Sequence, residues 1–252
     1  MSFAANMVIL VLALATSLAF TLVMNRLWPV EQRYVESDQV GWQLNVLGTT
    51  YAVTLGFMLY TGWGDFKAAE LNVELEANSL RNIYRLAQGL PHDRTEIERL
   101  TIEYATETVE KDWPDMARGK TPEESHEVNE RLWKVLLSVH IGEPMEAAAH
   151  DHALSELSTL TTHRRTRLLD GKYALPGIFW CALLVGGVLT IFSVAIFGAR
   201  QPRIHIVQVI SLTLLITLLM LTIADIDKPF QGWVHVSDYS FRRALATMRE
   251  VP

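Results

Sequence analysis

Cysteine is almost absent from this sequence of 252 residues, in which Cys181 is the single one. No intramolecular disulfide can form, and cysteine usage says nothing of the redox compartment. Basic clusters are also scarce: the net charge is −6, and the longest basic block is Arg164-Arg165-x-Arg167. Nucleic acid is therefore not a predicted partner. No alternating strand pattern and no internal repeat stand out, which favours an all-α protein.

The sequence also lacks the motifs of the common enzyme classes. It has no nucleophile elbow, no glycine-rich phosphate loop and no helix with two zinc-binding histidines. His150 and His152 would lie about 200° apart on a helix, and His126 with Glu130 shares a face but has no third ligand nearby. We therefore predict no enzyme, no cofactor and no metal site.

Four long stretches contain no Asp, Glu, Lys or Arg, and each is long enough to cross a bilayer. They are residues 2–25, 39–64, 173–199 and 204–224. No Lys or Arg precedes the first stretch, so it lacks the positive leading region of a cleaved signal peptide and is expected to be a span. The sequence predicts four transmembrane helices: a first pair in residues 1–64 and a second pair in residues 173–226.

Four spans place both termini and residues 65–172 on one side of the membrane. That side holds all but four of the 22 Lys and Arg residues. The four exceptions occupy the two short loops and are Arg26, Arg33, Arg200 and Arg203. Because positive charge accumulates on the cytoplasmic side, we expect a cytoplasmic domain at residues 65–172 and a cytoplasmic tail at residues 227–252.

The predicted cytoplasmic domain is helical nearly throughout. No helix breaker occurs between Phe66 and the stop signal Gly89-Leu90-Pro91, so the second span should continue to about Leu90 as one helix. Further helices are expected from about His92 to the break at Arg118-Gly119, then from Thr121, and from Pro144.

The second span carries a stripe of small and polar residues at helical spacing. Its members are Asn45, Thr49, Ala52, Gly56 and Trp63, with Gly48 and Tyr60 at the margins. The small residues could let a neighbouring helix approach closely. Alternatively, Asn45 and Thr49 could face an aqueous path enclosed by several subunits.

The same stripe continues past the membrane boundary through charged residues. These are Lys67, Glu70, Glu74 and Arg81. They could line a wet vestibule, but a solvated helix face has the same pattern. The acidic members favour cations and the basic members favour anions, so the pattern leaves charge selectivity open.

Two carboxylates mark the end of the fourth span. Asp225 and Asp227 precede Pro229, which cannot continue a helix, and Phe230. We expect the two Asp residues to cap an interfacial turn, with Phe230 as an apolar anchor for a tail that runs along the membrane surface.

Several segments together resemble the bacterial bestrophin-like family of multi-pass membrane proteins. The matching pieces are Gly48 to Gly56, Glu74 to Leu80, Ile83 to Ala87, Arg164-x-x-Arg167, Leu175-Pro176 with Trp180, and Asp227-Lys228-Pro229-Phe230-x-Gly232. Bestrophins proper are pentameric channels with four spans per subunit, cytoplasmic termini and a pore lined by the second span. The resemblance implies the same plan here, in a bacterial inner membrane.

Two departures from the family pattern bear on function. Bestrophins narrow the pore with bulky apolar side chains on the second span, whereas the stripe here is small and polar; a different face, through Tyr51, Leu55 and Leu59, could supply a constriction. Animal bestrophins hold calcium with an acidic cluster near the corresponding Pro-Phe, where this chain has only Asp225 and Asp227. The sequence therefore does not support calcium regulation.

The leading hypothesis is a homo-oligomeric ion channel or transport pore, with a pentamer favoured and the second span lining the conduit. Its partners would be the lipid bilayer, further copies of itself and small inorganic ions. The alternative is a non-conducting membrane scaffold or signalling protein that binds a partner through its cytoplasmic helices. The size of that domain, over a hundred residues, supports the alternative.

Overall fold

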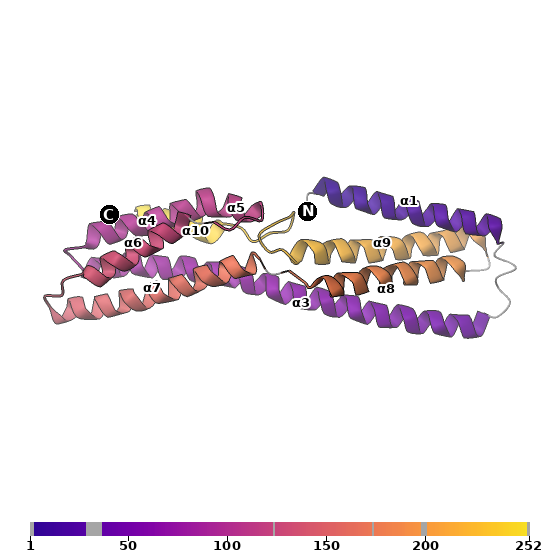
Figure 1. The fold of residues 1–252 in the computed structure, drawn as a ribbon, viewed down its shortest axis with the longest axis horizontal. Helices are drawn as coiled ribbons and strands as arrows, with labels where there is room; N and C mark the ends of the chain where they lie inside the picture. The colour runs from indigo at the N-terminus through magenta and orange to yellow at the C-terminus, as the bar shows by residue number, and fades with distance from the viewer. Residues whose placement is uncertain (1–2, 29–36, 123, 173, 198–200, 251–252) are drawn as a thin grey trace. The chain divides into compact units, whose positions relative to one another are not determined.

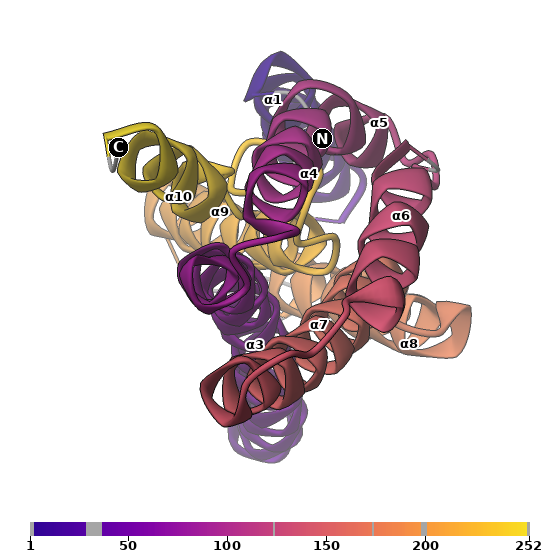
Figure 2. The same cartoon turned by 90° about the vertical axis from the view of Figure 1, so that its left-hand side faces the viewer.

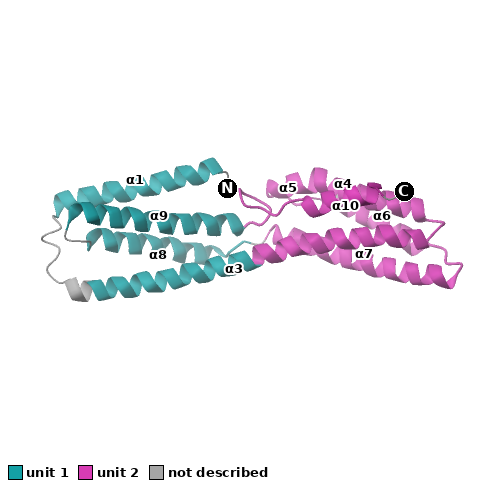
Figure 3. Cartoon of the chain, turned by 180° about the vertical axis from the view of Figure 1, so that it is seen from behind, with its two compact units in different colours: residues 1–64, 174–227 teal, residues 65–173, 228–252 magenta. Residues whose placement is uncertain are grey.

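The computed structural model describes residues 3–28, 37–122, 124–172, 174–197 and 201–250. Within these ranges all regular structure is helical, which confirms the all-α prediction (Figure 1). The chain divides into two compact units, coloured separately in Figure 3. Unit 1 comprises residues 1–64 and 174–227, and unit 2 comprises residues 65–173 and 228–252. The predicted loop residues Arg33 and Arg200 lie outside the described ranges.

The described residues of unit 1 form four long helices. These are α1 (Phe3–Leu27), the first part of α3 (Ser37–Leu86), α8 (Gly177–Ile196) and α9 (Pro202–Ile226). Helix α9 packs against both α1 and α8. The α3 helix is continuous for 50 residues and crosses from unit 1 into unit 2. This confirms the prediction that the helix runs past residue 64, because no residue there interrupts the backbone hydrogen bonds.

Tyr51 of α3 is central to the packing of unit 1. Its ring is 7% exposed and its hydroxyl donates a hydrogen bond to the carbonyl oxygen of Leu183, at 2.9 Å. Helix α8 can lie this close because it carries Gly186 and Gly187 at the contact; a Cβ at either would lie 2.7–2.8 Å from the tyrosine. Leu55, Leu183, Ile216 and Ile223 belong to the same buried cluster.

Three of the described helices are long and apolar enough to cross a membrane, namely α1, α8 and α9. The described part of α3 is not among them. Threonine, tyrosine and glycine make up much of its first half, so α3 is the least apolar of the four predicted spans. The number of four spans and the cytoplasmic location of residues 65–172 stay predictions.

Unit 2 contains the second part of α3 and seven further helical segments. These are the 3₁₀ turn η1 (Ala87–Gly89), α4 (Arg94–Glu107), the π-helical turn η2 (Thr108–Asp112), α5 (Trp113–Ala117), α6 (Glu124–Ser138), α7 (Pro144–Asp170) and α10 (Tyr239–Glu250). Figure 2 shows α3, α4, α6, α7 and α10 around a common centre. Helix α4 lies in the stretch predicted to be helical from about His92, and it fully buries Ile97, Leu100 and Tyr104.

Two helix starts in unit 2 follow from local sequence. Glu143 and Glu146 form a capping box at the beginning of α7, with Pro144 in its first turn. Pro114, in the first turn of α5, has no N–H to donate to residue 110, and the π-helical turn η2 directly precedes α5. The next break is Gly119, whose φ of +74° suits glycine.

The C-terminal residues differ from the predicted separate tail. They belong to unit 2, because α10 packs on α4 and buries Phe241, Ala244 and Met248. These three residues lie on one helical face. Residues 228–250 are thus part of the folded helical unit.

Candidate functional site

The predicted stripe lies on the open face of α3. Asn45, Thr49, Ala52, Gly56, Tyr60 and Trp63 are all exposed, and Tyr60 reaches 78%. A Cβ at Gly48 or Gly56 would meet no atom within 4 Å. The small residues therefore do not serve a helix contact within one chain. Gly48, Ala52 and Gly56 border an open cavity of about 170 Å³ that leucine side chains of α9 also line.

The other face of α3 is used inside unit 1. Tyr51 and Leu55 are 7% and 3% exposed and pack against α8 and α9. The alternative lining that the sequence left open, through Tyr51, Leu55 and Leu59, is therefore occupied by packing within the subunit. Tyr51 is held there by its hydrogen bond to Leu183.

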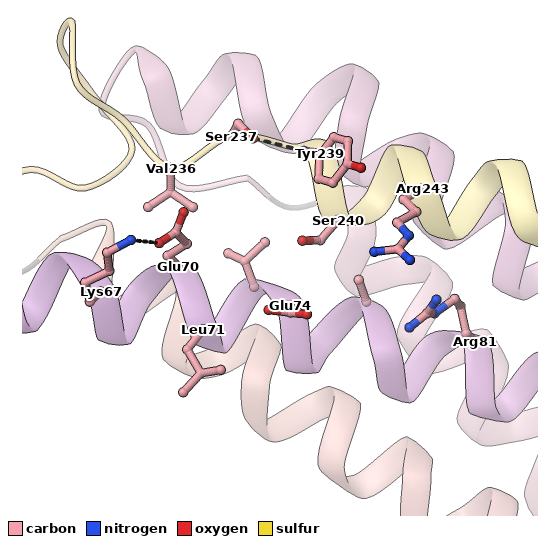
Figure 4. A pocket seen from close by; sticks show the side chains of 12 residues that line it. Lys67, Glu70, Leu71, Glu74, Arg81, Val236, Ser237, Tyr239, Ser240 and Arg243 are labelled. Carbon is pink, nitrogen blue, oxygen red and sulfur yellow. Dashed lines mark hydrogen bonds and ion pairs between the residues drawn. The ribbon is translucent and has the colours of Figure 1, made fainter.

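The four charged residues predicted on the continuing stripe come together in unit 2. Lys67, Glu70, Glu74 and Arg81 line one open groove of about 360 Å³ (Figure 4). Its opposite wall is formed by residues 236–243, including Ser237, Tyr239, Ser240 and Arg243. The structure thus adds a second wall that sequence reasoning missed.

Charges in this groove are unequally paired. Lys67 Nζ lies 2.6 Å from a Glu70 carboxylate oxygen, so these two charges largely offset each other. Arg81 donates to the side-chain oxygen of Asn78 at 2.9 Å. In the described part of the chain, neither Glu74 nor Arg243 forms an ion pair, and Figure 4 shows the Arg81 and Arg243 guanidinium groups turned toward the same part of the groove.

Arg243 was missed because no α10 helix was predicted. A helical-wheel signal was available: Phe241, Ala244 and Met248 form one apolar face, which leaves Tyr239 and Arg243 on another. Tyr239 is 65% exposed. The apolar face explains why α10 is held against unit 2 with its Arg243 in the groove.

A buried ion cluster fixes α3 within unit 2. Arg167 of α7 donates to both carboxylate oxygens of Glu76 on α3, at 2.7 and 3.1 Å, and to Asp112 of η2 at 3.0 Å. Tyr104 of α4 donates to Glu76 at 2.7 Å. The side chains of the ion pairs are fully buried. The Arg167 guanidinium also lies 5.4 Å from the centre of the Trp113 ring.

These contacts shift two pKa values. Burial on its own lowers the pKa of Arg167, but the Glu76 carboxylate outweighs it and the pKa lies above the ordinary value. Burial, with the Glu76 charge, raises the pKa of Tyr104 well above the ordinary value. Both groups therefore keep their protonated forms at neutral pH, and Arg167 stays positive between two carboxylates.

At the turn predicted after the fourth span, the two Asp residues form hydrogen bonds that the sequence did not predict. Helix α9 ends at Ile226, but Asp225 accepts a hydrogen bond from the Asn6 amide of α1 at 3.0 Å, and Asp227 accepts one from the Leu175 backbone N–H at 2.7 Å. Both carboxylates thus satisfy donors of other segments of unit 1. Neither bond caps the turn itself.

Phe230 is not at the surface, where the sequence placed it. It is 3% exposed and meets the Trp113 ring edge to face, with centroids 5.8 Å apart. The backbone turns between Lys228 and Gln231, so Phe230 points into unit 2. An aromatic side chain gains more from this apolar core than from a wet surface, which explains the difference.

These observations define a class: an all-α membrane protein with three strongly apolar helices and one long helix whose small and polar face is open. A family model of the Bestrophin-like domain matches residues 11–241. The chain therefore belongs to the bestrophin-like family, which confirms the resemblance seen in the sequence.

Solved structures show the same fold. A mutant of a bacterial bestrophin homologue from Klebsiella pneumoniae matches with a TM-score of 0.72 at 11% identity, over 95% of this chain and 98% of that one. Another structure of that homologue gives 0.67 at 12% identity, over 94% and 97%. A crystallised membrane protein gives 0.72 at 12% identity, over 94% and 97%. No curated protein matches the chain.

Proposed function

We propose that this chain assembles into a homo-oligomer, with a pentamer favoured, that conducts ions across a bacterial inner membrane. Helix α3 lines the conduit. Four helices of each subunit span the bilayer, and residues 65–172 and 227–252 are cytoplasmic. Membership of the bestrophin-like family supports this plan.

The exposed face of α3 is the observation that carries the proposal. The residues that α1, α8 and α9 expose include Val11, Val188 and Val207, each more than 60% exposed and suited to lipid. Helix α3 also exposes apolar side chains such as Val53 and Phe57, but one of its exposed faces carries Asn45, Thr49 and Gly56. Exposing polar side chains to lipid costs free energy, so we infer that this face contacts another helix or water.

An oligomer is required by this proposal. The described parts of α1, α8 and α9 expose apolar side chains, and one subunit cannot enclose a water-filled path with one polar face. Copies of α3 arranged around an axis would supply a closed wall. The open space at Gly48 and Gly56 would let neighbouring helices approach.

Two measurements test the proposal. The mass of detergent-solubilised protein, together with cross-linking in native membranes, should give a multiple of the subunit mass; a monomer in both would contradict it. Purified protein in planar bilayers should carry current. An intact oligomer that passes no current across voltages, pH values and calcium concentrations would favour the non-conducting scaffold instead.

A further inference from the structure

The segment between α9 and α10 presents an apolar tip. Phe230 and Val236 are 3% and 2% exposed, whereas Trp233 and Val234 between them are 64% and 37% exposed. Gly232 has a φ of +94°, a conformation that lets the chain turn there. The loop of residues 229–236 therefore buries its two ends and turns Trp233 and Val234 outward.

This loop is closed and anchored at its base. The Val236 N–H donates to the Pro229 carbonyl oxygen at 2.7 Å, which joins the two ends. Trp113 donates its indole N–H to the Val236 carbonyl oxygen at 3.2 Å and packs against Phe230. The exposure of Trp233 thus belongs to a held loop with both ends fixed in unit 2.

The position of the loop in the chain limits the surfaces it can reach. Trp233 is seven residues beyond Ile226, the last residue of α9, which is long and apolar enough to span a membrane. Even a fully extended chain would keep Trp233 within about 25 Å of that helix end. The turns at residues 228–231 shorten this reach.

The chemistry of the tip matches the lipid headgroup region. Tryptophan concentrates at the membrane–water boundary, where its ring is partly in the apolar phase and its N–H stays hydrated. Val234 adds apolar surface beside it. Exposed Lys228, at the base of the loop, supplies a positive charge for anionic headgroups.

We propose that the loop of residues 229–236 is a membrane-surface anchor, in which Trp233 and Val234 enter the headgroup layer of the leaflet where α9 ends. The anchoring function that the sequence suggested for Phe230 then belongs to Trp233. The occupant of this surface is lipid. This inference does not depend on whether the protein conducts ions.

Site-specific fluorescence tests the anchor in the full chain. In a Cys181→Ser background, Trp233→Cys is labelled with an environment-sensitive fluorophore, and the protein is placed in vesicles of phosphatidylcholine and phosphatidylglycerol. Leu137→Cys is the matched control, since Leu137 of α6 is 68% exposed and belongs to the same unit. A second label at Val234→Cys repeats the test if the first label disturbs folding.

The label at position 233 should show a blue-shifted emission and lose intensity when lipids carry a nitroxide near the headgroup. The label at position 137 should emit as in water and stay unquenched. Equal, weak quenching at positions 233, 234 and 137 would overturn the anchor. A blue shift without lipid quenching would also overturn it, because it would show that another protein surface covers the tip.

Discussion

Arg167 keeps a positive charge although it is fully buried, because two carboxylates pair with it there. Removing a guanidinium from water costs several kcal/mol, which only close, well-oriented carboxylates can offset. Glu76 supplies two such bonds and Asp112 supplies one. The three residues come from α7, α3 and η2, so the cluster ties the long helix to two other elements.

Arg167→Met tests this link. The change leaves Glu76 and Asp112 buried without their cation, and we expect a loss of stability of about 3–5 kcal/mol. Thermal or denaturant unfolding in detergent measures it. Arg99→Met is the control: Arg99 pairs with Glu96 and Glu103 at the surface, where ion pairs contribute little. Equal effects of the two substitutions would show that burial does not set the strength of the Arg167 cluster.

Asp170, at the end of α7, provides a test by pH. Burial raises the pKa of Asp170, and repulsion from Asp65 raises it further. The folded protein therefore disfavours the charged form, so folding loses stability as the pH rises through that pKa. Asp170→Asn should unfold at a higher temperature than the parent at pH 7.

Because the pKa of Asp170 is raised by folding, the stabilising effect of Asp170→Asn should depend on pH. Below about pH 3, under the unfolded Asp pKa of about 3.9, the carboxyl is mostly neutral in both the folded and the unfolded chain, so the advantage of Asp170→Asn should largely disappear there. Asp151→Asn, an exposed position on the same helix, is the control. An advantage that persists unchanged in acid would mean that the substitution acts through packing.

Single residues were only partly predictable from the sequence. The sequence showed the patterns Arg164-x-x-Arg167 and the Glu-rich run after Glu74. It did not show that Arg167 binds Glu76. That pair joins residues 91 positions apart, and no local periodicity reports such a contact. The sequence shows that Phe230 lies close to a span, so its side chain was predicted at the surface. The sequence does not show its contact with Trp113.

At the scale of elements, α3 has two faces with different partners. One face packs in unit 1 through Tyr51 and Leu55, and the other is open along the stripe. Substitutions on the two faces should therefore have different consequences. Changes on the buried face should affect the fold of one subunit, and changes on the open face should affect the contacts of the proposed oligomer.

Gly56→Leu should leave the subunit folded but weaken assembly or current. A Cβ at position 56 would meet no atom of its own chain within 4 Å, so we expect the main effect to come from a neighbouring helix or from the conduit. Native mass measurement and bilayer current report it. Val46→Leu adds bulk to α3 about 80° away from Gly56 and should change neither. Normal assembly and current in Gly56→Leu would contradict both interpretations of the stripe.

Gly186→Ala is the complementary change. Its Cβ would lie 2.7 Å from a ring carbon of Tyr51, so α8 or the tyrosine must move. We expect a loss of thermal stability in the subunit itself. A variant as stable as the parent would show that α8 can shift at no cost, and that Gly186 does not set the distance between α8 and α3.

Elements were easier to predict than contacts. The absence of helix breakers after Gly64 predicted the continuous helix α3. The glycine at position 119 predicted the break there. The turn η2 was missed, although Pro114 was a visible signal, because a π-helical turn arises from how a helix accommodates a proline and its tertiary partners. Helix α10 was missed because its apolar face was not counted.

For the whole molecule, the family and the all-α fold could be predicted, because long uncharged runs and several motifs spread along the chain are properties of the sequence. The assembly could not. The groove in unit 2 needs two walls, from α3 and from residues 236–243, which are far apart in sequence. The sequence showed only the charges of α3, and the structure adds Arg243 to the charges that line the groove.

If the protein forms the proposed channel, the charges of this groove should influence its ion selectivity. Glu70→Gln with Glu74→Gln removes both carboxylates of the groove and leaves Lys67 without the partner 2.6 Å away. If copies of the groove surround the conduit, the local potential becomes more positive and the preference for cations should fall. Arg243→Gln should shift selectivity in the opposite direction.

Reversal potentials under a salt gradient measure both changes, at low ionic strength where screening is weakest. Glu127→Gln with Glu130→Gln is the matched control, since it changes the net charge equally on exposed positions of α6. Opposite shifts for the Glu70, Glu74 pair and for Arg243, with no shift for the control, would place the groove on the ion path. Reversal potentials that match the parent in every variant of a conducting protein would instead place Glu70 and Glu74 on a solvated outer face, away from the ions.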